Sequence, residues 1–284
     1  MKRKLYSRRS FLKTGKAALI AVPIFAKQGV LGLGRAPGPS DQVQVGFIGC
    51  GGRGQQLMKQ LPPDARIVAI CDCYLPRCEQ AKKRYNASWD VYQDYRKLLD
   101  RKDIEAVVVP TTDHARVLCC IHAAQAGKDI YAEKPLTLTI YEGRVLVRAV
   151  RKYRRVFQTG TQQRSMEMNE FACKFIREGG IGKVHTVQCH NYTGPTVYTG
   201  LPEQPIPKGL DWDMWCNRTE LRPYNSRLQF GWMAWRAYSG GEMTNWGAHG
   251  VDQVQWALGM DAVSYTHLRA HETRHDLVCR LLLE

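Results

Sequence analysis

The sequence predicts an α/β fold: a doubly wound parallel sheet, followed by a second α/β domain with an open, mostly antiparallel or mixed sheet. Three observations predict it. Short apolar runs alternate with helical patterns between residues 43 and 160, which is typical of parallel strands joined by helices. A glycine-rich turn joins the first of these runs to the first helical pattern. After residue 164 the chain becomes rich in Pro, Gly and Trp over long stretches, which indicates a second domain with functional loops.

The expected elements of the first domain, 43–160, follow one another closely. Each short run rich in Val, Ile and Ala predicts a buried strand, and these runs lie at 43–49, 65–72, 104–111 and 129–135. Helices are predicted between them at 54–61, 77–85, 94–100 and 114–127, the last ending at a glycine. In the second domain, 161–262, we expect a helix at 169–182, a strand at 183–192 and helical structure at 244–259.

The first residues predict an export signal. "SRRSFLK" (Ser7–Lys13) places two arginines ahead of a short apolar run, the pattern of a twin-arginine signal. We interpret 1–35 as a removable signal peptide and 36–42, rich in Pro, Gly and Ser, as a linker. The apolar run at 17–26 contains Pro23 and is shorter than a membrane span. We therefore expect export by the twin-arginine machinery to the periplasm or beyond it, without a stable membrane anchor.

Charge and cysteine content exclude two other classes. The net charge is +15, but residues 1–35 hold nine Lys and Arg and no acid, which leaves +6 for the rest. The basic run at 144–155 has helical spacing and indicates a solvated helix face, so no nucleic-acid partner is expected. The ten cysteines match no metal-binding spacing. We expect buried free thiols and no metal.

The final segment, 263–284, resembles translated sequencing-adapter read-through. His267, His271 and His275 would share one face of a helix, as in a zinc site. The resemblance instead leads us to treat this tail as non-native and to assign it no function. The second domain is then expected to be incomplete here.

A G-x-G-x-x-G motif carries the strongest chemical signal. Gly49, Gly51 and Gly54 follow the first strand and open a helix. Their expected roles are to make a tight turn, to admit a pyrophosphate and to let the helix pack closely on the strand. Asp72 ends the second strand, where a carboxylate accepts hydrogen bonds from ribose hydroxyls. Because no Lys or Arg follows before Arg77, NAD is favoured over NADP.

A lysine ends a later strand. Lys134 lies in "AEKPL", at the carboxyl edge where ligands of such sheets bind. An ammonium group there can hydrogen-bond a substrate oxygen and stabilise its charge as C–OH becomes C=O. From the residues alone, a solvated surface lysine remains the alternative.

Six motifs together resemble the glucose–fructose oxidoreductase/inositol dehydrogenase (Gfo/Idh/MocA) family. They are GCGGRG, Asp72, "VVVPTTDHARV", "AGKDIYAEKPL", "QTGTQQRS" and "GGEMTNWGAHGVDQVQWALG", within residues 43–262. With the leader and "DWDMWCNRTELRPYN", the chain is similar to the exported branch. The chain has Asn245 where the family usually has Asp, and Arg116 where its T-P-D-H-W-H motif ends in His.

The resemblance implies a Rossmann domain and a set of site residues. Lys134 would lie by the nicotinamide, and His249 would be the acid/base group, since its pKa lies near working pH. The expected cofactor-binding residues are Gly49, Gly51, Gly52, Arg53, Gly54, Asp72, Thr111, His114 and Glu133. Those expected to hold substrate are Arg164, Arg236, Tyr238 and Asn245.

The expected function is NAD-dependent oxidation of a sugar or polyol carbinol by hydride transfer. One alternative keeps NAD bound through a redox-neutral cycle, as in a glycosidase or lyase that oxidises, eliminates and reduces. A second alternative is a non-catalytic dinucleotide- or sugar-binding module, motivated by Asn245 and the altered 111–116 segment. The resemblance also implies a homo-oligomer in the full-length protein.

Overall fold

The computed structural model describes residues 42–260, 268–273 and 276–282. The predicted leader at 1–35 and all but the last residue of the predicted linker lie outside the described residues. Within the part that is described, no helix is both long and apolar enough to cross a membrane.

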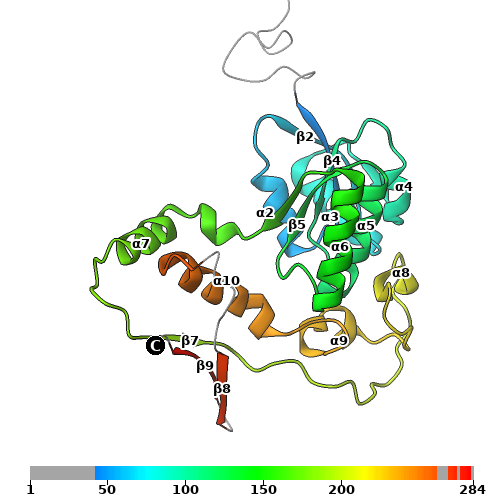
Figure 1. The fold of residues 1–284 in the computed structure, drawn as a ribbon. Helices are drawn as coiled ribbons and strands as arrows, with labels where there is room; N and C mark the ends of the chain where they lie inside the picture. The colour runs from blue at the N-terminus through cyan, green and yellow to red at the C-terminus, as the bar shows by residue number, and fades with distance from the viewer. Residues whose placement is uncertain (1–41, 261–267, 274–275, 283–284) are drawn as a thin grey trace, which may run out of the picture. The chain divides into compact units, whose positions relative to one another are not determined.

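The first part of the chain forms a six-stranded parallel sheet with the order β3-β2-β1-β4-β5-β6 (Figure 1). Its strands are β1 (Val43–Ile48), β2 (Ala65–Cys71), β3 (Asp90–Tyr92), β4 (Ala106–Val109), β5 (Asp129–Glu133) and β6 (Phe157–Gly160). The connecting helices are α2 (Gly52–Lys59), α3 (Leu75–Tyr85), α4 (Tyr95–Leu99), α5 (Asp113–Gln125) and α6 (Ile140–Tyr153). The strand order reverses between β1 and β4, which is the point where such sheets bind ligands. The predicted doubly wound sheet is confirmed.

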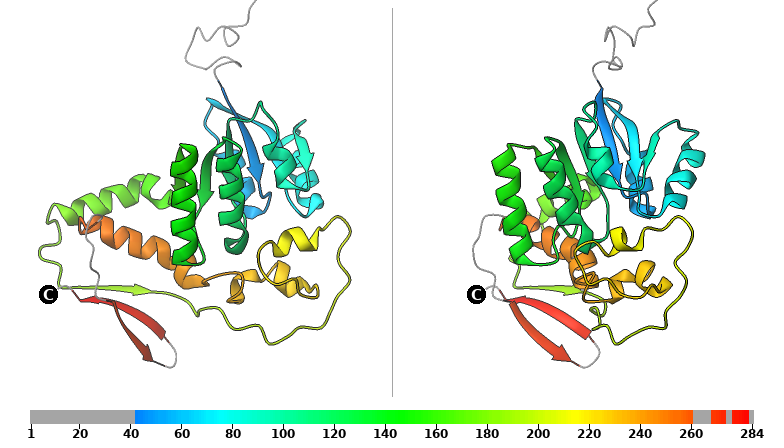
Figure 2. Two further views of the ribbon diagram at one scale, coloured as in Figure 1. Left: turned by 45° about the vertical axis from the view of Figure 1, so that its right-hand side comes forward. Right: turned by 90° about the vertical axis from the view of Figure 1, so that its right-hand side faces the viewer.

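Helices cover both faces of this sheet because its central strands are apolar on both sides. One core cluster joins the sheet to α4, α5 and α6, and includes Leu98, Cys120 and Leu146. The second joins the other face to α2 and α3 through Met58 and Cys78. Figure 2 shows α5 and α6 side by side. Two packed faces fix the positions of the loops at the carboxyl ends of the strands.

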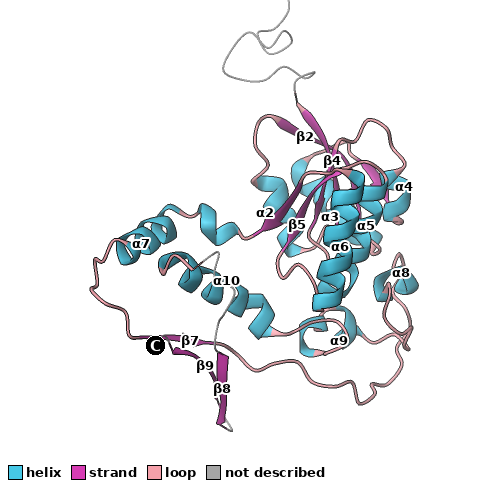
Figure 3. Ribbon diagram, in the orientation of Figure 1, coloured by secondary structure: helices cyan, strands magenta, loops and turns pink. Residues whose placement is uncertain are grey.

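The rest of the chain forms the second α/β part (Figure 3). It contains η1 (Gln162–Ser165), α7 (Glu167–Arg177), β7 (Thr186–His190), α8 (Trp212–Cys216), α9 (Ser226–Gln229), η2 (Trp232–Ala234), α10 (Glu242–Ala257), β8 (Leu268–Thr273) and β9 (Asp276–Leu282). The strands pair antiparallel in the order β7-β9-β8, as expected for an antiparallel second sheet.

Several elements differ from the sequence prediction. Strands β3 and β6 were not predicted, because their short segments DVY and FQTG contain no apolar run. The helix expected at 169–182 ends at Arg177, since Gly179 and Gly182 adopt φ of +85° and +74°. The segment expected to be a non-native tail contains β8 and β9, and β9 pairs with β7. His267 and His275 lie outside the described residues, and His271 lies in a strand rather than a helix.

Seven of the described cysteines are buried free thiols, as predicted, and Cys73 is a half-buried free thiol. Cys189 is half-buried. Burial raises the pKa of Cys71 well above its usual value, so it is held as a neutral thiol. Among the residues described, no group of three or more His, Cys, Asp or Glu side chains could hold a metal ion.

Candidate active site

The glycine-rich turn between β1 and α2 is held by backbone geometry. Gly49 has φ of +113°, and its N–H donates to the Cys71 carbonyl at 2.7 Å. A Cβ added to Gly54 would lie 2.3 Å from the Gly49 carbonyl oxygen and 3.3 Å from Cγ of Pro110. Side chains are therefore excluded at Gly54 by backbone contact, in agreement with the close packing expected of the third glycine.

The start of α2 is open to a ligand. A Cβ on Gly52 would meet nothing within 4 Å, and one on Gly51 would approach only the Arg77 guanidinium, at 3.9 Å. No side chain caps the helix at Gly51. Unpaired N–H groups and the positive end of the helix dipole favour an anion at such a position. The geometry fits a pyrophosphate.

Asp72 lies next to this turn and is 6% exposed. Its carboxylate accepts the N–H of Cys50 and the N–H of Tyr74, both at 2.9 Å. Arg77 also lies beside it, with Nη1 3.8 Å from Oδ2. The sequence favoured NAD because no Lys or Arg follows Asp72 before Arg77, and in the structure α3 brings Arg77 next to Asp72. Its positive charge offsets part of the repulsion between Asp72 and a 2′-phosphate, so the site fits NAD and also admits NADP.

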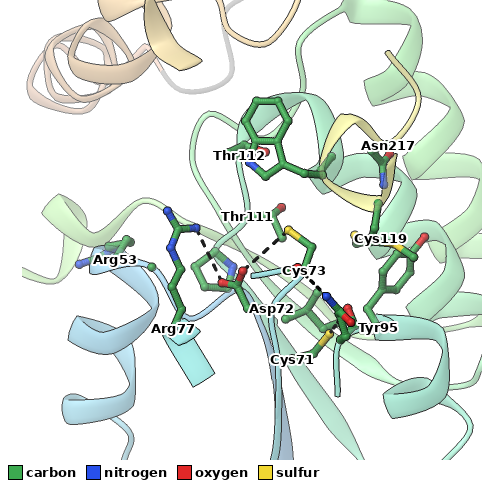
Figure 4. A pocket seen from close by; sticks show the side chains of 18 of the residues that line it. Arg53, Cys71, Asp72, Cys73, Arg77, Tyr95, Thr111, Thr112, Cys119 and Asn217 are labelled. Carbon is green, nitrogen blue, oxygen red and sulfur yellow. Dashed lines mark hydrogen bonds and ion pairs between the residues drawn. The ribbon is translucent and has the colours of Figure 1, made fainter. Parts of the chain in front are cut away.

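A cavity of about 240 Å³ lies over these residues (Figure 4). Asp72, Gly51 and Gly52 line it on the sheet side, and Thr111 lines it from the loop after β4. Three lining residues have a buried polar atom without a hydrogen-bond partner: Arg53 Nη2, Thr111 Oγ1 and Asn217 Oδ1. Buried polar atoms are normally paired. These atoms could therefore bind a polar ligand such as a dinucleotide.

Glu133, at the end of β5, is linked to the glycine turn by a hydrogen bond from Arg53. It is 2% exposed, and its Oε1 accepts Arg53 Nε at 2.7 Å. Its other oxygen accepts the backbone N–H of Lys134 at 3.1 Å. Glu133 therefore orients Arg53 beneath the cavity and fixes the backbone that carries Lys134.

Lys134 lies between the two parts of the chain. Its Nζ donates to Oδ1 of Asn245 at 2.6 Å and to the Asn245 carbonyl at 3.2 Å. Asn245 in turn donates to Glu242 at 3.1 Å. Burial lowers the pKa of Lys134, and the charges of Glu133 and Asp113 oppose this shift. With two of its three N–H groups used, the ammonium group has one donor left for a ligand oxygen.

His249 lies on α10, one helical turn after Asn245, and is 5% exposed. Its Nε2 lies 3.3 Å from Nε2 of Gln162 on η1. Burial and the positive charge of Lys134 lower the pKa of His249, and Asp252 opposes the shift. A neutral imidazole beside an ammonium group can accept a proton from a substrate hydroxyl.

Arg116 holds the loop that carries Lys134. It is 3% exposed and donates to the carbonyls of Thr111 and Pro135. It also contacts Oδ1 of Asp113 at 3.3 Å, and Asp113 Oδ2 accepts the Ser239 hydroxyl at 2.9 Å. Burial raises the pKa of Asp113, and Arg116 opposes this. The residue that replaces the family's histidine thus joins the loops after β4 and β5.

Two family models match the chain. The model described as "Oxidoreductase family, NAD-binding Rossmann fold" matches residues 43–161. The one described as "Oxidoreductase family, C-terminal alpha/beta domain" matches residues 174–279. The chain belongs to the Gfo/Idh/MocA oxidoreductase family.

Several relatives of this Gfo/Idh/MocA chain are enzymes named for reactions on carbohydrates or polyols. An inositol 2-dehydrogenase of Salmonella typhimurium is 27% identical over 172 residues, 59% of this chain and 50% of its own length. A 2,7-anhydro-N-acetylneuraminate hydratase of Mediterraneibacter gnavus is 30% identical over 151 residues, 52% of this chain and 39% of its own. The structure of myo-inositol 2-dehydrogenase from Lactobacillus plantarum shares the fold, with a TM-score of 0.56 and 23% identity over 77% of this chain and 57% of that one. The chain spans about half the length of the curated relatives it matches first.

Not every predicted site residue of the Gfo/Idh/MocA chain lies at the cavity. His114 and Tyr238 are fully buried, with ring centroids 4.8 Å apart, and burial lowers the pKa of His114 to about 4. Neither side chain lines the cavity, and their contacts with cofactor and substrate stay predictions. Arg164 forms a two-pronged ion pair with Asp252 at 2.8–3.1 Å, and Arg236 is exposed.

Three residues of the site were not predicted from the sequence. Gln162 contacts His249, Arg116 holds the Lys134 loop, and Asn217 lines the cavity. Arg116 carried a signal, since it departs from the family motif. Gln162 and Asn217 lie in segments quoted for the resemblance, but nothing in their spacing predicts which side chain turns inward.

Proposed function

We propose that this chain is a NAD-dependent oxidoreductase that oxidises a CH–OH group of a sugar or polyol. One observation carries the proposal: Lys134 Nζ donates to Asn245 Oδ1 at 2.6 Å, one helical turn before His249 on α10, although Lys134 and His249 are 115 positions apart in the sequence. The inositol 2-dehydrogenase names of the relatives support a small carbohydrate as substrate.

Four residues of the chain have separate roles in this reaction. His249, kept neutral by its lowered pKa, accepts the proton of the substrate hydroxyl. Lys134 donates its remaining N–H to the same oxygen and stabilises the negative charge that develops there. Asn245 holds the ammonium group in place, and Gln162 orients the imidazole. When bound, the nicotinamide supplies the hydride acceptor.

The test is turnover on a panel of sugars and polyols, followed at the NADH absorbance band. Lys134→Ala is expected to lose at least 100-fold in kcat while NAD still binds, because its ammonium group acts mainly in the transition state. Lys183→Ala, an exposed lysine outside the site, is the matched control and should equal the wild type. Full turnover by Lys134→Ala with intact NAD binding would refute the assignment.

A second candidate is a redox-neutral reaction at the same site. The hydratase name of the M. gnavus relative motivates it, since hydration involves no net oxidation. Lys134 and His249 would then act in a cycle in which the bound NAD returns to its starting state. Product formation without accumulation of NADH would favour this candidate, whereas accumulation of NADH favours the dehydrogenase.

We also infer export and assembly, on the evidence of the sequence. "SRRSFLK" supports passage through the twin-arginine machinery to the periplasm. Replacing Arg8 and Arg9 with Lys should retain the protein in the cytoplasm of a bacterial host. The family resemblance supports a homo-oligomer, which sedimentation of the full-length protein would test. The resemblance of 263–284 to adapter read-through remains our interpretation of that tail, and sequencing of the genomic locus tests it.

A further inference from the structure

The cavity over Asp72 has a wall that does not come from the dinucleotide-binding sheet. This wall is lined by Met214, Trp215, Asn217 and Trp232, which all belong to the segment Gly209–Trp232, containing α8 and α9, of the second part of the chain. They line the same cavity as Asp72, and Figure 4 labels Asn217 and Asp72 among the lining side chains. A ligand held by the glycine turn would therefore also contact this segment.

Backbone hydrogen bonds fix this wall to the sheet. The N–H of Leu75 donates to the Gly209 carbonyl, and the N–H of Asp211 donates to the Cys73 carbonyl, both at 2.9 Å. Tyr74 and Leu210 form the antiparallel bridge between them. These contacts begin at Cys73, one residue after Asp72. They therefore hold the wall next to the carboxylate that would bind the ribose.

A second set of contacts holds the wall at α5. His114 Nε2 lies 2.9 Å from the Trp215 carbonyl, and Arg218 Nε donates to the His114 carbonyl at 2.8 Å. The buried rings of Trp212 and Trp215 stack with centroids 4.5 Å apart. The wall is thus packed and hydrogen-bonded on both sides of the cavity.

Asn217 ends α8 in a conformation that non-glycine residues rarely adopt, with φ of 55° and ψ of −119°. Its backbone N–H donates to the Asp213 carbonyl at 2.9 Å. Its side-chain Oδ1 is buried and has no hydrogen-bond partner. Such a conformation is kept where the surrounding structure enforces it. Here it carries an unpaired acceptor into the lining of the cavity.

We propose that Gly209–Trp232 covers the adenosine half of the bound dinucleotide, and that Asn217 Oδ1 accepts a hydrogen bond from the exocyclic amino group of adenine. This inference rests on the proposed function. The pyrophosphate belongs at Gly51–Gly52 and the ribose at Asp72, so the base occupies the part of the cavity beyond Asp72. The side chains of Tyr95, Cys119 and Trp215 line the cavity and suit the faces of a flat ring.

The wall has a consequence for cofactor exchange. A dinucleotide enclosed between the sheet and a hydrogen-bonded segment can leave only when some of those contacts open. Opening costs free energy, so dissociation is slow. The wall is therefore expected to slow release of the dinucleotide.

The experiment measures dinucleotide binding by the full 284-residue chain with isothermal titration calorimetry. The probes are NAD and nicotinamide hypoxanthine dinucleotide, in which a carbonyl replaces the adenine amino group. Asn217→Gly removes the amide but keeps a backbone that tolerates positive φ. Asn86→Gly is the matched control, since Asn86 is exposed, has φ of 46° and does not line the cavity.

Asn217→Gly is expected to bind NAD about tenfold more weakly and to lose any preference between the two probes. Asn86→Gly should bind both as the wild type does. Asn217→Asp keeps acceptor oxygens but cannot rotate to present a donor, so it should prefer NAD over the hypoxanthine analogue at least tenfold.

Two results overturn the inference while leaving the proposed function intact: NAD affinity of Asn217→Gly within twofold of the wild type, or no preference by Asn217→Asp, in a chain that still turns over with NAD. A wild-type chain that binds neither dinucleotide overturns both proposals.

Discussion

The substitution Gly54→Ala tests the geometry of the glycine turn most directly. The new Cβ would lie 2.3 Å from the Gly49 carbonyl oxygen, a contact that no side-chain rotation can relieve. Overpacking of this kind costs about 1–3 kcal/mol, and contact with backbone places it near the upper end. Alanine recovers about 1 kcal/mol of helix propensity over glycine. We expect the free energy of unfolding to fall by about 2 kcal/mol.

Gly52→Ala provides the contrast, because both glycines lie in the first turn of α2. A Cβ on Gly52 meets nothing within 4 Å, so the propensity gain of up to about 1 kcal/mol remains. The two variants should therefore differ in stability by up to about 3 kcal/mol in opposite directions. Gly52→Ala should still bind NAD more weakly, since its methyl group would occupy the space open to the pyrophosphate.

The assay is thermal unfolding of the chain without added dinucleotide, followed by circular dichroism. For a chain of this size, 1 kcal/mol corresponds to about 2–4 °C in Tm. Gly54→Ala should therefore melt about 4–8 °C below the wild type, and Gly52→Ala at or slightly above it. If Gly54→Ala melts at or above the wild type, or both variants melt equally low, the packing argument is wrong.

Three further predictions concern the catalytic side of the site. In an NMR titration, His249 should titrate below the usual histidine range because of burial and Lys134; Lys134→Met should raise its pKa, and an unchanged value would contradict the proximity. Asn245→Asp places a carboxylate on the Lys134 ammonium, so the pKa of Lys134 should rise, observable by ¹⁵N-detected titration, with Asn245→Leu as the uncharged control. Arg116→Met leaves buried Asp113 without its cation and should cost about 3–5 kcal/mol in urea unfolding; a loss below 1 kcal/mol would show that Arg116 does not hold the loop.

Much of the first domain could be predicted because its signals are local. Burial makes β4 (AVVV) and the last four residues of β1 (VGFI) apolar, and the helices between them follow from periodicity. The glycine spacing predicted the turn, since a tight turn and a close helix contact each require glycine at a fixed position. Strands β3 (DVY) and β6 (FQTG) were missed because neither contains an apolar run like the AVVV of β4.

The sequence by itself determined the parallel sheet, the glycine turn and the identity of Lys134 and His249 as candidate groups. Only the tertiary structure decided what surrounds them. Asn245 contacts Lys134 across 111 positions, Arg77 reaches Asp72 through the start of α3, and Asn217 lines the cavity from a distant segment. Local sequence sets backbone periodicity and turns, whereas contacts between distant segments depend on how whole elements pack. The environment that sets pKa values and encloses a ligand is therefore a property of the packed molecule.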